Sequence, residues 1–174
     1  SQCSNESASN AVLQLAMDEE QWQQTQAVRF ELGVPFALNH LNPLTQPSPL
    51  NLPDMFWSWR MGYKFLRLDI QTTDEQEPRA WSYHLGSVGC QSASTLRPPE
   101  QACAQPNRFT LDVPVAAHSA RFNLDLSALL AGIDVESMPG CMFHTGAETS
   151  CEILSKNVQQ NTLVREYANG VGRE

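Results

Sequence analysis

The sequence lacks any apolar run close to the ~20 residues that a membrane-spanning helix needs. It is also poor in basic residues, with 11 Lys and Arg against 19 Asp and Glu and a formal net charge of -8. Nucleic acids and anionic lipid surfaces attract basic proteins, so this charge disfavours both as partners. The chain begins at Ser1 without a methionine, which indicates processing or trimming.

The motifs of common hydrolases and nucleotide-binding enzymes are missing as well. The sequence has no G-x-S-x-G elbow, no glycine-rich phosphate loop, no H-E-x-x-H and no EF-hand loop. Asp69, Asp112 and Asp125 lie in alternating segments, where we expect them to face solvent without forming an acid–base pair. These absences predict a binding protein rather than an enzyme.

Short segments of alternating apolar and polar residues dominate what is present. They cover residues 27–32, 64–70, 81–85, 109–113 and 120–126, with a further candidate at 10–17. Helical signal is weak and is confined to short stretches at 53–59 and 127–132. This pattern predicts an all-β fold, an antiparallel β-sandwich or open barrel with long ordered loops and one or two short helices.

The length of 174 residues and the 41% hydrophobic content suit one globular domain. We predict a β-rich domain over residues 1–157 and a polar C-terminal tail over 158–174. The loop from 35 to 53 holds five prolines, and a long ordered loop of this kind on a β scaffold often carries function.

Four of the five cysteines form two local pairs. Cys90 and Cys103 flank one polar loop, and Cys141 and Cys151 flank another. Neither spacing is that of a zinc ribbon or a thioredoxin, so two disulfides are predicted, each contributing about 3 kcal/mol. Disulfides imply an oxidising compartment: periplasm, cell surface or secreted. Cys3 is left without a partner.

Histidine is scarce, with four residues in the chain. His40 follows a proline-broken loop and His84 lies in an alternating segment, so two neutral imidazoles could converge where loops gather. Two histidines without a cysteine thiolate suit one copper ion, Cu(I) in particular, better than four-coordinate structural zinc. Packing is the competing interpretation for each histidine. His118 is predicted at the surface, and His144 could bind a metal only if Cys141 were reduced.

Trp57, Trp59 and Tyr63 concentrate aromatic surface within seven residues. They could plug one end of a sandwich, or stack on a sugar as in a carbohydrate-binding module. Met55 and Met61 could add a soft thioether donor, although core packing is the more common role of methionine.

The ordered set of segments LGVPFALNH, PSPLNLPDMFWSWRMGYKFLRLD, HLGSVGC, CAQPNR and PGCMF resembles one family. This is the methanobactin-operon P-type family (MbnP-like, the "metallo-mystery pair" four-Cys proteins). It is related to the copper-repressible surface proteins CorA and MopE of methane-oxidising bacteria. The resemblance spans about residues 30–151.

The resemblance implies a periplasmic, surface or secreted protein of a copper acquisition or handling system. It implies one copper ion on His40 and His84, and a nearby tryptophan oxidised to kynurenine by a dihaem partner of the cytochrome c peroxidase type. Trp59 is the first candidate for this modification, with Trp57 and Trp81 behind it. Calcium on aspartate-rich loops, copper oxidoreductase activity and a surface adhesion or sugar-binding role stay open as alternatives.

Overall fold

The computed structural model describes residues 16–71, 79–119, 121–142, 149–160 and 162–167. Its strands are β1 (Ala27–Leu32), β2 (Phe56–Ser58), β3 (Gly62–Gln71), β4 (Ala80–Gly86), β5 (Phe109–Pro114), β6 (Phe122–Leu124), β7 (Cys141–Met142) and β8 (Val164–Glu166). The helices are α1 (Glu19–Gln24), α2 (Phe36–Asn39), α3 (Leu126–Leu129) and α4 (Thr149–Val158), with 3-10 turns η1 (Pro43–Thr45) and η2 (Pro53–Met55).

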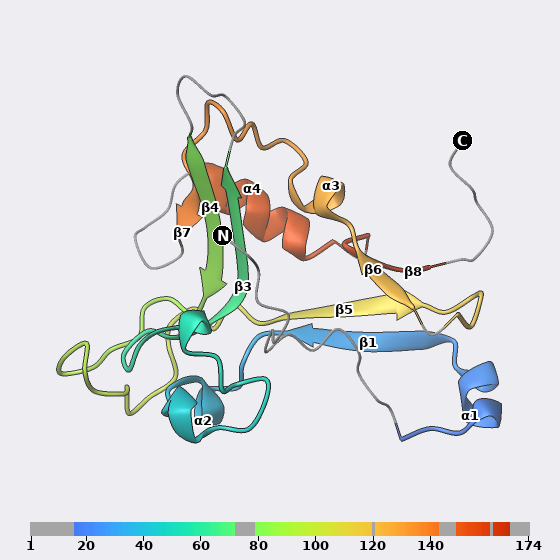
Figure 1. The fold of residues 1–174 in the computed structure, drawn as a ribbon, viewed down its shortest axis with the longest axis horizontal. Coiled ribbons are helices and arrows are strands. Elements are labelled where there is room, and N and C mark those ends of the chain that lie inside the picture. The colour runs from blue at the N-terminus through green and yellow to red at the C-terminus, as the bar shows by residue number, and fades with distance from the viewer. Residues whose placement is uncertain (1–15, 72–78, 120, 143–148, 161, 168–174) are drawn as a thin grey trace, which may run out of the picture.

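Three small sheets make up the described fold. One has the strand order β2-β3-β4-β7, while β1 pairs with β5 and β6 pairs with β8. All pairs are antiparallel except β4–β7, which is parallel. The β1–β5 ribbon runs across one end of the β3–β4 pair (Figure 1). The all-β prediction is therefore confirmed, in an open arrangement rather than a closed barrel.

Alternation in β4 separates the core from the site described below. Trp81, Tyr83 and Leu85 point to one face and are at most 1% exposed. Leu154 and Val158 of α4 belong to the same buried cluster. Successive strand residues face opposite sides of a sheet, so His84 and Gly86 belong to the other face.

A disulfide joins α4 to this core. Cys141 of β7 is bonded to Cys151 of α4, and Tyr83 lies beside Cys141 in the sheet register. Helix α4 was not predicted from the sequence, because buried polar residues such as Ser150 and Asn157 interrupt its apolar face. Asn157 nevertheless fixes the helix, since its side-chain amide donates to the carbonyls of Leu129 and Ala131.

The predicted short elements agree in part with the structure. The segment 127–132 contains most of α3, whose first turn is capped by the Asp125 carboxylate. The segment 53–59 is helical only over η2 and continues as β2. In the predicted tail, residues 164–166 form β8. The candidate strand at 10–17 lies mostly outside the described residues, and Cys3 and His144 lie outside them entirely. No described helix is long and apolar enough to cross a membrane.

Loops gather at one end of the β3–β4 pair. The segment carrying α2 and the turns that follow it lies there, beside the loop that leaves β4 after Gly86 (Figure 1). Tyr63, near the start of β3, donates its backbone N–H to the side chain of Asn39 and its hydroxyl to the carbonyl of Leu50. These bonds attach the proline-rich loop to the sheet.

Candidate metal centre

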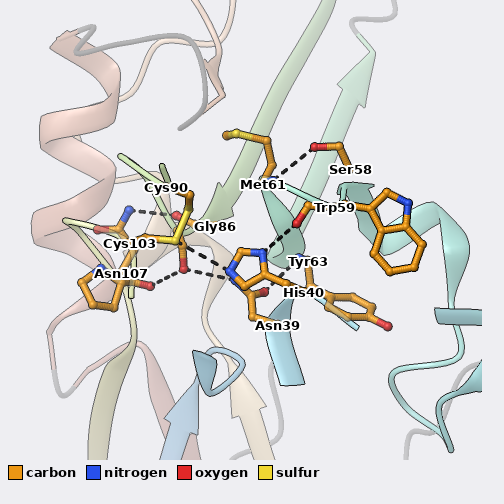
Figure 2. Close-up of a disulfide and its surroundings, with 12 residues drawn as sticks. Asn39, His40, Ser58, Trp59, Met61, Tyr63, Gly86, Cys90, Cys103 and Asn107 are labelled. Carbon is orange, nitrogen blue, oxygen red and sulfur yellow. Dashed lines mark hydrogen bonds between the residues drawn. A yellow bond between two sulfur atoms is a disulfide. The ribbon is translucent and has the colours of Figure 1, made fainter. Parts of the chain in front are cut away.

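His40 lies directly after α2 and is 5% exposed. Its Nδ1 is 3.0 Å from the carbonyl oxygen of Trp59 (Figure 2). A carbonyl only accepts, so Nδ1 carries the proton and Nε2 keeps a lone pair. Burial lowers the pKa of His40 below its usual value, and the hydrogen bond to Trp59 offsets only part of this effect. His40 is therefore a neutral imidazole at neutral pH, the form that binds metals.

Asn39 holds this histidine in place. Its Oδ1 accepts the backbone N–H of Tyr63, and its Nδ2 lies 3.3 Å from His40 Nε2 and 3.4 Å from Ser87 Oγ. Gly62 permits the close approach, because a Cβ at this position would lie 2.5 Å from Asn39 Nδ2. The buried asparagine thus ties the α2 segment to the beginnings of β3 and of the loop after β4.

His84 shows a complementary arrangement on the other face of β4. Its Nε2 lies 2.7 Å from Asp69 Oδ1 of β3. The carboxylate accepts, so Nε2 carries the proton, and the buried Nδ1 has no hydrogen-bond partner within the described structure. A histidine that binds a metal through one ring nitrogen usually donates the N–H of the other to a carboxylate, a carbonyl or water. His84 has this arrangement, with Nδ1 as the nitrogen that could bind a metal.

Asp69 is also more than the solvent-facing carboxylate predicted from the sequence. Burial raises its pKa, but hydrogen bonds from Ser82, His84 and Arg67 together lower the pKa far below its ordinary value. Asp69 therefore stays ionised over the whole physiological pH range and keeps the imidazole of His84 oriented.

Trp57 covers the His84 face of the sheet. Its ring centre lies 6.4 Å from that of His84, and Lys64 Nζ lies 6.0 Å from the Trp57 ring centre on the same sheet. The ring also rests on Gly86, where an added Cβ would come within 2.4 Å of Trp57 Cζ3. A glycine here is what lets the indole approach β4.

The other two candidate tryptophans have different surroundings. The Trp59 ring packs edge-on against Phe56 at 5.8 Å, while its carbonyl holds His40. Trp81 is 1% exposed and faces the core side of β4, opposite His84. The segment 57–59 therefore contacts both histidines, the ring of Trp57 beside His84 and the backbone of Trp59 at His40.

The Cys90–Cys103 disulfide, predicted from the spacing, lies against His40. Cys103 Sγ is 3.7 Å from His40 Nε2, and the Nε2 and both sulfur atoms lie within 4.8 Å of one another (Figure 2). This contact was not predicted from the sequence, because 63 residues separate His40 from Cys103.

The remaining candidates from the sequence are His118, Met61 and the carboxylates of the predicted calcium site. His118 is half-buried rather than exposed, with Nε2 3.1 Å from the carbonyl of Thr25 and its ring edge-on to Trp22. Met61 donates its backbone N–H to Ser58 Oγ. Among described residues, no three Asp or Glu carboxylates converge, so the calcium expectation finds no support there.

Comparisons with known proteins agree on one family. The family model for MbnP matches residues 4–143, which include both histidine clusters. The solved structure of MbnP from Methylosinus trichosporium superimposes with a TM-score of 0.59 at 24% sequence identity. That match covers 74% of this chain and 51% of the other, so this chain spans about half the length of the solved protein. Curated protein sequences gave no match.

Proposed function

This chain belongs to the MbnP family, and on that basis we propose that it binds a single copper ion in a copper acquisition or handling system. The observation that carries the proposal is the buried, partnerless Nδ1 of His84 with Asp69 behind the other ring nitrogen. Such an imidazole presents one lone pair and has its orientation fixed, as a metal ligand requires.

His40 is the proposed second ligand. Its Nε2 lone pair is free of any proton, and the long 3.3 Å contact with Asn39 is weak enough for a metal to replace. Neutral imidazoles bind copper well, and two of them suit Cu(I). Both histidines contact the 57–59 segment, His40 at the Trp59 carbonyl and His84 at the Trp57 ring, and the proposal requires one copper ion to bind both free nitrogen atoms beside this segment.

We also propose that one tryptophan of this site is oxidised to kynurenine by a dihaem partner of the cytochrome c peroxidase type. Indole is the most readily oxidised large side chain in the chain, and proximity to His84 favours Trp57 over Trp59 and Trp81. The pair of disulfides supports a location in the periplasm, at the cell surface or outside the cell.

The sugar-binding alternative receives less support. Tyr63 is 2% exposed, and the rings of Trp57 and Trp59 are half-buried, so they do not form an open stacking platform. Copper oxidoreductase activity would need a proton donor or acceptor at the metal. Asp69 is the carboxylate beside His84, and it already accepts a hydrogen bond from the His84 ring.

Protein purified from its own host tests both parts of the proposal. Metal analysis should give one copper per chain, and peptide mass spectrometry should find one tryptophan with a carbon atom lost and an oxygen atom gained. A metal-free protein would contradict the copper assignment. Unmodified masses at Trp57, Trp59 and Trp81 would contradict the kynurenine assignment alone.

A further inference from the structure

A buried histidine nitrogen lies against the Cys90–Cys103 disulfide. His40 Nε2 lies 3.7 Å from Cys103 Sγ, and Cys90 completes a group whose ligand atoms are all within 4.8 Å. An imidazole nitrogen and a thiolate on one metal ion lie about 3.5 to 3.8 Å apart for bond angles between tetrahedral and trigonal. The nitrogen and sulfur atoms are therefore already at a metal-ligand separation.

The loop closed by this disulfide can open without disturbing the core. Residues 91–102 contain no helix or strand and are mostly exposed. The surface over the loop is hollowed, with a volume of about 490 Å³ lined only by its own residues from Gln91 to Gln101. Regions with few buried contacts open locally at low free-energy cost. Cys90 and Cys103 themselves are buried, at 9% and 6% exposed, so a small reductant would reach them through local opening of this loop.

The second disulfide lacks these properties. Cys141 is fully buried in β7, Cys151 lies in α4, and both belong to the hydrophobic core cluster. Within the described structure, the converging group of His and Cys ligand atoms includes neither of them. We therefore expect reduction to begin at Cys90–Cys103, which are the cysteines that lie beside an imidazole among the described residues.

We propose that reduction of Cys90–Cys103 creates a second, sulfur-rich metal site, in which His40 Nε2 and the two thiolates bind one Cu(I) ion. A dithiol supplies two electrons and two protons, the S–S bond breaks, and the dithiol becomes a disulfide. Copper then replaces the two thiol protons, which leave to solvent. Soft thiolates favour Cu(I), and three donors match its low coordination number better than structural zinc, which takes four.

This inference goes beyond the two-histidine site but shares His40 with it. Copper would be held by nitrogen ligands while the disulfide is intact and by sulfur and nitrogen ligands after reduction. One copper per chain is expected in either state, because His40 cannot serve both sites at once.

The test uses the full chain carrying His84→Ala, which removes the two-histidine site. Cu(I) is supplied anaerobically from a coloured chelator to the disulfide-intact and the phosphine-reduced forms. The intact form should take no copper and the reduced form one per chain. Isotope-coded alkylation with peptide mapping should then show copper protecting Cys90 and Cys103, but not Cys141 or Cys151, by about tenfold in rate.

Adding His40→Gln should weaken Cu(I) binding to the reduced form about tenfold or more, since one of three ligands is lost. Equal copper uptake by the two forms, protection of Cys141 and Cys151 instead, or an unchanged affinity with His40→Gln would each overturn the inference. Failure of the copper proposal for the two histidines appears separately, as absent binding to disulfide-intact wild-type protein.

Discussion

At the scale of single residues, two histidines have matching environments. Each imidazole gives one N–H to a fixed oxygen, the Trp59 carbonyl for His40 and the Asp69 carboxylate for His84. Each therefore keeps a lone pair on its other nitrogen: His84 Nδ1 is buried without a hydrogen-bond partner within the described structure, and His40 Nε2 has a 3.3 Å contact with the Asn39 amide and lies 3.7 Å from Cys103 Sγ. A buried polar atom without a partner costs free energy unless something binds it. This shared pattern is the basis of the copper assignment.

The oriented His84 ring predicts a role for Asp69. Asp69→Asn keeps the size of the side chain but removes the charge that fixes the His84 tautomer, so Cu(I) affinity should fall about 10- to 100-fold. A competition titration with a Cu(I) chelator measures this change. Asp112→Asn is the matched control, because Asp112 pairs with Arg29 on the β1–β5 ribbon. Equal affinities of wild type and Asp69→Asn would contradict the orienting role.

Burial of His40 predicts a pH dependence of stability. Its pKa is lowered in the folded protein, so as pH falls below about 6.5 the unfolded chain takes up a proton that the folded chain does not. The free energy of unfolding should therefore decrease with falling pH, by up to about 1.4 kcal/mol per pH unit, until the lower folded-state pKa is passed. Stability contributed by carboxylates is lost only at lower pH.

Denaturant titrations of metal-free protein between pH 7.5 and 5.5 check this dependence. The His40→Gln variant should show a flatter profile in the same window, because it cannot take up the proton. Parallel profiles for the variant and the wild type would show that His40 titrates normally in the folded state.

At the scale of elements, the short strands brought the site together. Strand β2 carries Trp57 over Gly86 of β4, and the β3–β4 register puts Asp69 diagonally beside His84. The site therefore depends on close strand approach as much as on its ligands.

Gly86→Ala tests this approach. The added Cβ would collide with Trp57 at 2.4 Å, so the indole should move away, changing the near-ultraviolet circular dichroism and lowering Cu(I) affinity. Gly132→Ala is the control, because it adds backbone strain at φ +78° while its nearest contact, Ile153, lies 3.7 Å away. A wild-type spectrum and affinity for Gly86→Ala would contradict the packing of Trp57 on β4.

Helix α4 depends on one buried asparagine. Asn157→Ala removes two hydrogen bonds of 2.8 Å and leaves the carbonyls of Leu129 and Ala131 without that donor. The free energy of unfolding should fall by about 2 kcal/mol or more, as measured by denaturant titration. Gln159→Ala removes one exposed hydrogen bond and should change stability by less than about 0.5 kcal/mol. Similar losses in both variants would contradict the bridging role of Asn157.

The strands could be predicted from the sequence far better than the helices or the contacts of the site. Alternation predicted β1, β3, β4 and β5 because each buries one face. It missed α4, where buried Ser150 and Asn157 obscure the apolar stripe. Both disulfides followed from local spacing, whereas the Asp69–His84 and His40–Cys103 contacts depend on strand register and loop packing that composition does not encode.

At the scale of the whole molecule, the fold places its two disulfides differently. Cys141–Cys151 locks α4 onto the buried face of β4, while Cys90–Cys103 closes an exposed loop against His40. His84 lies on the face of β4 opposite this core, and His40 lies after α2 beside the loop. Reduction at the loop can change the ligands near His40 while the core stays intact.

The most direct test of the central claim is the copper stoichiometry of disulfide-intact protein in four forms: wild type, His40→Ala, His84→Ala and His118→Ala. Cu(I) is added anaerobically against a competing chelator, and bound copper per chain is measured after desalting. Wild type and His118→Ala should retain one copper, because His118 lies apart with Trp22 and Thr25. His40→Ala and His84→Ala should retain none. Full occupancy in both of these variants would contradict the two-histidine copper site.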